Sequence, residues 1–279
     1  MSKRKNAKGR FLTILFSVIS VLYVLPIVII FINSLKKNAY ISKAPFSFVD
    51  EKNFAGFENY ETGIERTQFF ESLFWSVFIT VGAVALIILC TSMCAWYIAR
   101  SNSRLCRILY ILFVFSMIVP FQMVMFTLSK TADTLGLNTP WGIILVYLGF
   151  GAGLAVFMFS GFIKSVPVQI EEAAMIDGCS PLGTFFRIVL PILRPTCISV
   201  AILETMWIFN DYLLPYLVLD IRKYKTIPIA IQYLRGGYGS IDMGAMMAML
   251  VLSVIPIIIF YLCLQKYIIK GVAAGAVKG

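Results

Sequence analysis

Glu204 and Asp211 are the residues whose types and positions most suggest chemistry, because both carboxylates lie within a largely apolar stretch. They are seven residues apart, about two helical turns, so a helix would place them on nearly the same face. Trp207 lies between them and Asn210 precedes Asp211. Carboxylate, amide and indole groups suit a hydroxyl-rich solute, through hydrogen bonds and stacking. We therefore hypothesise that these four residues line a path for such a solute. The alternative is that Asp211 lies near a membrane interface and Glu204 bonds another helix.

Catalytic and metal-binding groups are scarce. The chain has no histidine, which excludes His-based acid–base catalysis and most transition-metal sites. Cys90 and Cys94 are one helical turn apart but lack nearby histidines or carboxylates, so we expect buried thiols and no metal site. The phosphate-binding pattern G-x-x-x-x-G-K-[ST] does not occur. We expect a non-enzymatic chain with no catalytic residues and no cofactor of its own.

The composition is that of an integral membrane protein. Hydrophobic residues make up 59% of the 279 residues and charged residues 14%. Soluble domains have roughly 45–50% apolar and about 25% charged residues. These values exclude an ordinary soluble enzyme and a disordered chain. The net charge of +10 in so apolar a chain indicates an anionic membrane surface rather than nucleic acid.

Six apolar runs are long enough to cross a bilayer, which needs about 20 residues in a helix. They cover residues 11–32, 72–99, 108–129, 141–163, 196–219 and 243–265. We find no convincing cleavage site after the first run, so we expect it to be a retained span rather than a signal peptide. Prolines lie within four of these runs, at positions 26, 120, 215 and 256, and each can kink its helix.

The distribution of charge predicts the orientation and the organisation of the chain. If the N-terminus is cytoplasmic, the inner segments carry 14 Lys and Arg against 3 acids, and the outer segments 10 against 9. The positive-inside rule therefore favours both termini inside. We expect residues 1–71 to form a cytoplasmic tail, the first span and an ordered outer loop. Residues 72–265 would be the membrane-spanning core and 266–279 a cytoplasmic tail.

The inner segment between the fourth and fifth spans is predicted to form two short helices. Ser165 is a candidate N-cap for the first helix, and Gly178 is suited to end it in a left-handed conformation. Ser180-Pro181 then provides a cap and a first-turn proline for the second helix. Glu172 and Asp177 could meet cationic groups on a partner.

Seven positions of this segment match a known pattern at fixed spacing. They are Glu172-Ala173-Ala174, then Gly178, then Ile188-x-Leu190-Pro191. This pattern resembles the EAA loop of permease subunits in binding-protein-dependent ABC importers. Three further stretches resemble the MalG-like sugar-permease branch of that family. They are Trp96-Tyr97-Ile98-Ala99-Arg100, Trp207-Ile208-Phe209-Asn210-Asp211 and the C-terminal 270–279.

The resemblance implies an all-α integral membrane protein with six transmembrane helices, both termini inside and a MetI-like ABC permease fold. The EAA loop would be a cytoplasmic coupling helix that docks on an ATPase. Glu172 would be its polar anchor, Ala173 and Ala174 its close-contact face and Gly178 its turn. The full coupling set is Glu171, Glu172, Ala173, Ala174, Asp177, Gly178, Ile188, Leu190 and Pro191. For Glu171, simple solvation is the alternative.

The resemblance also implies a permease subunit of a bacterial cell-membrane importer that moves a sugar or oligosaccharide. Its implied partners are a second homologous permease, two copies of a cytoplasmic ABC ATPase, an external solute-binding protein, the sugar and the bilayer, with no nucleic acid. ATP and Mg would bind to the ATPase. A non-sugar ABC importer remains an alternative, as does a stand-alone secondary transporter or channel. An intramembrane enzyme is disfavoured by the missing catalytic groups. The absence of a detectable repeat and the EAA spacing argue against the stand-alone transporter.

Overall fold

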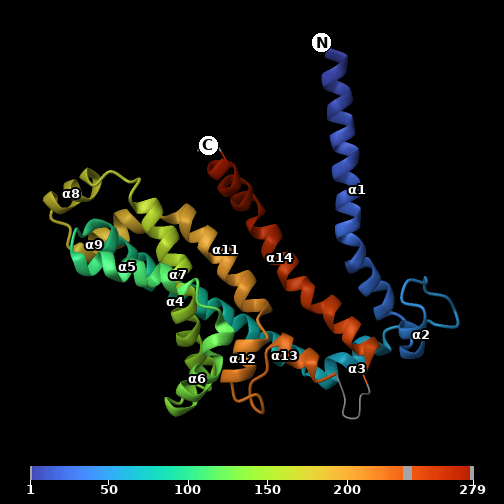
Figure 1. Cartoon of the computed structure of the whole chain (residues 1–279). Coiled ribbons are helices and arrows are strands. Elements are labelled where there is room, and N and C mark those ends of the chain that lie inside the picture. The colour runs from blue at the N-terminus through green and yellow to red at the C-terminus, as the bar shows by residue number, and fades with distance from the viewer. Residues whose placement is uncertain (1, 235–240, 277–279) are drawn as a thin grey trace. The chain divides into compact units, whose positions relative to one another are not determined.

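The computed structural model describes residues 2–234 and 241–276, which form helices joined by loops (Figure 1). Within these residues there is no strand, and one isolated antiparallel bridge joins Lys36 and Phe54. The expected all-α class is therefore confirmed. The chain divides into two compact units, one of residues 1–70 and 230–258 and the other of residues 71–229 and 259–279. Each unit is described by itself.

Four helices are long and apolar enough to cross a membrane, and up to six spans result if each of two bent pairs counts as one. The four are α1 (Ser2–Ser34), α4 (Phe69–Arg100), α7 (Pro140–Ile163) and α14 (Met243–Ala276). Four of the predicted runs correspond to these helices and the third to the first bent pair, whereas the fifth run shares only residues 196–210 with the second bent pair, which covers 181–192 and 194–210. α14 continues through most of the predicted C-terminal tail, whose last residues, 277–279, lie outside the described residues.

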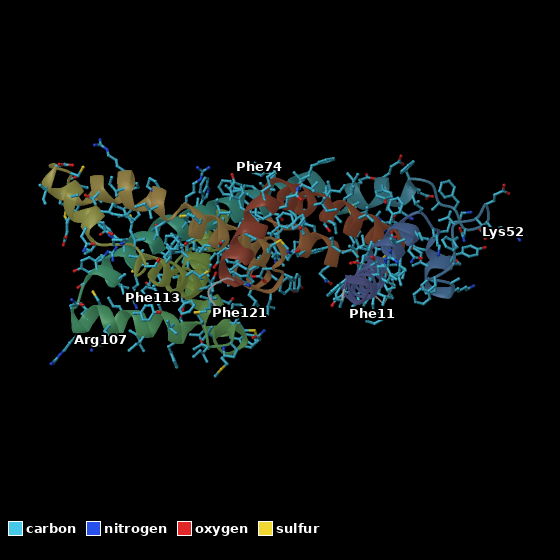
Figure 2. All side chains as sticks on the ribbon, turned by 90° about the horizontal axis from the view of Figure 1, so that it is seen from above. Phe11, Lys52, Phe74, Arg107, Phe113 and Phe121 are labelled. Carbon is cyan, nitrogen blue, oxygen red and sulfur yellow. The ribbon has the colours of Figure 1, made fainter. Side chains whose placement is uncertain are left out.

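The third predicted span is broken rather than continuous. α5 (Arg104–Ser116) and α6 (Phe121–Thr134) meet at an angle of 104°, and Phe113 and Phe121 flank the break (Figure 2). Pro120 occupies the position before α6 with an extended backbone, ψ 135°. Proline lacks the N–H that an interior helical position needs, and it disfavours helical geometry in the preceding residue. The expected kink is therefore a complete interruption.

The fifth predicted span ends earlier than residue 219. α11 (Arg194–Asn210) stops at Asn210, Asp211 is extended with ψ 125°, and α12 (Leu213–Val218) follows as a separate helix. Pro215 explains the interruption. In a continuous helix it could not bond the Asp211 carbonyl and its ring would clash there, whereas the first turn of α12 tolerates it.

The first unit contains the ordered loop that follows α1, as predicted. It includes α2 (Asn38–Lys43) and α3 (Glu58–Thr67). The Lys36 side chain is 0% exposed, and its Nζ donates to Asn33 Oδ1 at 3.1 Å, the Ala44 carbonyl at 3.1 Å and Ser47 Oγ at 3.2 Å. Burial lowers the pKa of Lys36, and the carboxylate of Asp50 partly opposes this effect. The buried ammonium thus ties the loop to the end of α1.

The start of α14 is fastened to the same loop. Asp242 accepts hydrogen bonds from Arg66 at 2.8 Å and from Asn38 at 3.0 Å. Gly63 of α3 lies directly against the Met249 side chain, so the two helices approach closely. These contacts join the loop to the end of α1 and to the start of α14 within the first unit.

The second unit is built around α7, whose most apolar stretch is half buried. Tyr147 and Phe159 of this helix are fully buried. Small residues let neighbouring helices approach, as in other membrane bundles. Gly151 faces Ile87 of α4 and Glu204 of α11, and Gly153 faces the last turn of α5.

The remaining short helices lie at opposite ends of this unit. α8 (Gln169–Ile176) and α9 (Pro181–Thr184) lie at one end, and α6 and α12 lie together at the other (Figure 1). The Ser129 hydroxyl joins α6 to α12 by donating to the Leu217 carbonyl at 2.7 Å. α13 (Ile227–Gln232) follows α12.

Candidate functional site

The loop between α7 and α11 folds as two short helices. Gly178 has φ +85°, and the N–H of Cys179 closes the end of α8 on the Ala174 carbonyl at 3.0 Å. The Ser180 hydroxyl accepts from the Gly183 N–H at 3.2 Å, with Pro181 in the first turn of α9. The predicted stop and restart are therefore confirmed. Left-handed geometry at Gly178 costs little only because glycine has no Cβ.

The predicted N-cap of the first helix is wrong. Ser165 donates its hydroxyl back to the Phe162 carbonyl at 2.7 Å, and α8 begins only at Gln169. Val168 occupies the capping position without a side-chain hydrogen bond. Ser165 lies directly after α7, where backward bonding to the free carbonyls of that helix end competes with forward capping.

Glu171 is held by several hydrogen bonds and is buried. The alternative that its carboxylate is simply solvated is therefore wrong. Its side chain is 5% exposed. Arg100 donates twice to Glu171 Oε1, from Nη2 at 2.7 Å and from Nε at 3.0 Å. Trp96 Nε1 donates to Oε2 at 2.8 Å. Each carboxylate oxygen therefore accepts a hydrogen bond, Oε1 from the charged guanidinium and Oε2 from the neutral indole. A buried carboxylate requires such partners.

The same donors connect three elements. Trp96 and Arg100 occupy successive turns at the end of α4, an i, i+4 spacing that aims both side chains at one place. Arg100 also donates to the Val166 carbonyl at 2.9 Å, and the Trp96 ring lies 5.6 Å from that of Phe185. We refer to Trp96, Arg100 and Glu171 as the α4–α8 clamp. The sequence signal for this contact was the i, i+4 spacing of Trp96 and Arg100 beside an inner loop.

Phe185 begins a π-helical turn, η1 (Phe185–Val189), which leads into α10 (Leu190–Ile192). The N–H of Leu190 bonds to the Phe185 carbonyl, five residues back, just before Pro191 removes the next donor. Phe185 and Val189 of this turn are buried, as is Leu193 after α10, and the turn packs against α8. The last three matched positions of the EAA pattern differ in burial: Ile188 and Leu190 are half-buried and Pro191 is exposed.

The outer face of α8 is open and mixed in character. Glu172, Ala173, Asp177 and Gly178 are exposed, whereas Ala174 is buried. Exposed apolar side chains surround them; Ile176 is 86% exposed. The further members of this exposed apolar group are Ile170, Met175, Leu182 and Phe186. We call this set, with Glu172 and Asp177, the α8 outer face. A cluster of large exposed apolar residues with two carboxylates is typical of an interaction surface.

The four path candidates do not lie on one continuous helix. Asp211 lies beyond the end of α11, which ends at Asn210. Its Oδ1 accepts from the Leu213 N–H at 2.9 Å, and Tyr147 Oη donates to its Oδ2 at 3.1 Å. Asp211 therefore caps α12 and bonds Tyr147 of α7, one turn from Gly151, which Glu204 faces. The single helix expected to carry both carboxylates is wrong, because α11 ends between them.

Glu204 is 2% exposed and lies in the helix packing against Gly151. Its Oε2 has no hydrogen-bond partner among the described residues. Trp207 meets the edge of the Tyr147 ring at 5.5 Å and 90°, and is 41% exposed. Asn210 is exposed, and within the described residues its amide donates to the carbonyl of Met206 at 2.7 Å. Trp207 and Asn210 are thus the accessible members of the set.

Comparison with known proteins identifies the family. Residues 87–274 match the family of binding-protein-dependent transport system inner membrane components. This range includes the α4–α8 clamp, the α8 outer face and all four path candidates.

Curated relatives match along the whole chain. A probable starch degradation products transport system permease protein, AmyC of Thermoanaerobacterium thermosulfurigenes, is 35% identical and covers 99% of both chains. The multiple sugar-binding transport system permease protein MsmG of Streptococcus mutans is 33% identical over 100% of both. The melibiose/raffinose/stachyose import permease protein MelC of Bacillus subtilis is 31% identical over 100% of both.

A solved structure has the same fold. A crystal structure of a bacterial ABC transporter involved in the import of the acidic polysaccharide alginate contains a chain with a TM-score of 0.80. That chain is 20% identical, and the alignment covers 96% of the present chain and 98% of the other. The resemblance inferred from the EAA spacing is therefore confirmed: the chain is a multi-pass membrane protein and belongs to the family of binding-protein-dependent transport system inner membrane components.

Proposed function

We propose that this chain is the permease subunit of an ATP-driven importer that moves a sugar or oligosaccharide into the cytoplasm. The observation that carries this proposal is the full-length similarity to permeases named for sugars and oligosaccharides. The exposed indole of Trp207 and amide of Asn210 support it, because they offer stacking and hydrogen bonding to hydroxyl-rich solutes.

The α8 outer face is the proposed docking surface for the ATPase. Glu172 and Asp177 would meet cationic groups there, and Ala173 leaves room for close approach. The α4–α8 clamp has a mechanical role in this proposal. Because Glu171 ties α8 to the last turn of α4, a displacement of α8 by the ATPase is transmitted to a transmembrane helix instead of being absorbed by the loop.

The positive-inside count supports an orientation with both termini and α8 in the cytoplasm. In this proposal two ATPase subunits bind ATP and Mg, and this chain binds neither. An external solute-binding protein delivers the sugar, and a second permease completes the pathway. The apolar stretch of α1, none of which is buried within the structure, suits contact with lipid or with that second permease.

Charge reversal on the α8 outer face tests the docking role. Glu172→Lys should abolish co-purification of the ATPase with the membrane complex, since it replaces an exposed anion by a cation at the proposed contact. Asp133→Lys is the matched control, because Asp133 is also exposed on a helix but lies on α6, at the other end of the same unit. Subunit ratios after mild-detergent purification provide the measurement.

Sugar uptake into vesicles containing the intact complex tests the transport role. Uptake should require ATP and the binding protein in the wild type and in Asp133→Lys, and should be absent in Glu172→Lys. ATPase recovery that is equal in both variants would remove the docking assignment. Uptake that proceeds without ATP would remove the importer assignment as well.

A further inference from the structure

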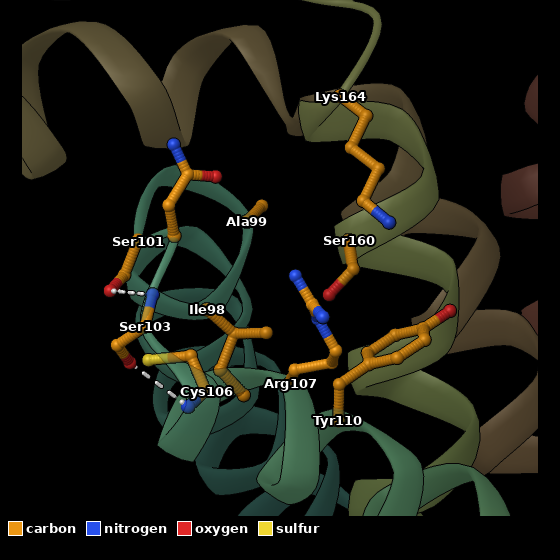
Figure 3. Close-up of a pocket in the computed structure, with 10 residues that line it drawn as sticks. Ile98, Ala99, Ser101, Ser103, Cys106, Arg107, Tyr110, Ser160 and Lys164 are labelled. Carbon is orange, nitrogen blue, oxygen red and sulfur yellow. Dashed lines mark hydrogen bonds between the residues drawn. The ribbon is translucent and has the colours of Figure 1, made fainter.

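A pocket of about 190 Å³ lies beside the end of α4, the start of α5 and the end of α7 (Figure 3). Its lining is polar and contains no carboxylate. The lining residues are Ile98, Ala99, Ser101, Asn102, Ser103, Cys106, Arg107, Tyr110, Ser160 and Lys164. Neither the α8 outer face nor any of the path candidates contributes to it.

Two cations border this pocket, Arg107 from α5 and Lys164 from the end of α7. Neither forms a salt bridge with a carboxylate in the described part of the chain. Lys164 Nζ lies 5.1 Å from the centre of the Tyr110 ring, which holds the ammonium at the pocket. Two unneutralised cations on one concave surface favour an anionic ligand.

The N-terminus of α5 adds to the positive potential. α5 has 13 residues, and Ser103 caps it by accepting from the Cys106 N–H at 3.1 Å. The first turn of a helix carries partial positive charge and backbone donors that favour anions. Ser101 and Ser103, both in the pocket wall, supply hydroxyl groups next to this turn.

Ser160 provides an independent indication of a ligand. Its side chain is 0% exposed, and its Oγ has no hydrogen-bond partner among the described residues. Figure 3 shows the Ser160 oxygen directed into the pocket, toward Arg107. Buried hydroxyl groups are nearly always hydrogen-bonded, so an unpaired one that faces a cationic pocket marks a place for an acceptor.

We propose that this pocket binds a phosphate group. A phosphate offers up to two negative charges and several acceptor oxygens, which match two cations, a helix N-terminus and the serine hydroxyls. A carboxylate would leave part of this donor set unused. With the proposed orientation the pocket faces the cytoplasmic side, where both anionic phospholipid headgroups and soluble phosphate esters are available.

The test uses the full-length chain and separates the two sources. One arm places the chain in nanodiscs of phosphatidylglycerol or of a phosphate-free neutral glycolipid. The other adds inorganic phosphate to the chain in a maltoside detergent. In each arm the midpoint of thermal unfolding is measured, and the phosphorus that stays bound is measured after exchange into phosphate-free maltoside detergent. A raised midpoint and retained phosphorus after phosphatidylglycerol alone assign a lipid headgroup, whereas a response to inorganic phosphate assigns a soluble source.

The decisive variant is Arg107→Gln/Lys164→Gln, which removes both cations from the pocket. Each lost charge-assisted hydrogen bond should weaken binding about tenfold. Arg104→Gln/Arg194→Gln is the matched control, because it removes two exposed positive charges that are not in the pocket wall. The control should keep the wild-type response. If the two double variants respond alike in both arms, the phosphate assignment is wrong.

Ser160→Ala provides a test that does not depend on charge. Without phosphate this variant should be as stable as the wild type or more so, because it removes an unpaired buried hydroxyl group. With phosphate it should bind several-fold more weakly. A wild-type affinity in Ser160→Ala would contradict the role assigned to this hydroxyl, and would leave a charge-only surface instead of a built site.

Discussion

Arg100 and Glu171 lie 71 positions apart in the sequence, and their side chains meet at 2.7 Å. The contact joins the last turn of α4 to the first turn of α8. Trp96 holds the other carboxylate oxygen, so the joint has two fixed points and resists rotation. We expect a helix attached in this way to move with α4 rather than as a free loop.

Removing the charge from this joint should loosen α8. In Glu171→Gln the guanidinium of Arg100, 21% exposed, loses its counter-charge, at a cost of about 1–3 kcal/mol. Hydrogen exchange over residues 166–180 should accelerate, and sugar-stimulated ATP hydrolysis in the complex should fall. Glu172→Gln is the control: its exposed carboxylate has no such role, and exchange should remain as in the wild type. Equal exchange in both variants would refute the clamp.

The left-handed turn at Gly178 should be sensitive to any side chain. A Cβ there meets open space, so the only penalty is the φ of +85°. Left-handed geometry costs an alanine about 1–2 kcal/mol. Gly178→Ala should therefore shift α8 relative to α9 and reduce uptake.

Gly161→Ala isolates this backbone effect. Its Cβ also meets open space, but Gly161 lies within α7 and has no positive φ. We expect wild-type uptake for this variant, measured in the same vesicles at equal complex content. Unimpaired uptake by Gly178→Ala would show that the turn tolerates another conformation.

The packing of α7 against α4 and α11 predicts a second pair of glycine variants. A Cβ at Gly151 would lie 2.6 Å from Ile87 Cδ1 and 3.0 Å from Glu204 Oε2. Gly151→Ala should therefore lower the thermal stability of the purified complex, by about 1–3 kcal/mol as for other overpacked cores. Gly149→Ala, two residues away with open space around its Cβ, should leave stability unchanged. The comparison fails if both variants unfold at the same temperature.

The path hypothesis is tested most cleanly at Asn210. Its side chain is exposed and, in the part of the chain that the structure describes, donates to the carbonyl of Met206 in its own helix, so truncation should cost the fold little. If the amide contacts the sugar, Asn210→Ala should slow uptake about fivefold, the value of one ordinary hydrogen bond. The measurement is initial uptake rate at saturating binding protein.

Met206→Ala is the matched control on the same helix, because Met206 is 43% exposed and carries no polar group suited to hydroxyls. Its uptake should stay near the wild-type rate. Equal rates for the two variants would exclude Asn210 from the path. Because Glu204 is buried in the packing, a loss of uptake in a Glu204 variant alone would not distinguish a path role from misfolding.

The sequence by itself determined the class of the protein and the local structure of its most informative loop. Apolar runs of about 20 residues have few alternatives to membrane helices, because unsatisfied backbone groups are too costly in lipid. The stop at Gly178 and the restart at Ser180-Pro181 were also predictable, since both depend on the residue's own backbone preferences. The fixed spacing of the EAA pattern was sufficient to predict the family.

Only the tertiary structure decided what the acidic residues do. Glu171 and Glu172 are adjacent and chemically identical, yet one is clamped by a residue 71 positions away and the other is exposed. Asp211 caps a new helix instead of continuing α11, because Pro215 cannot continue a helix that includes Asp211. The pocket has walls from three helices, so local sequence patterns could not predict it. The burial of its side chains and their hydrogen-bond partners depend on residues that are distant in the chain and meet only when the helices pack.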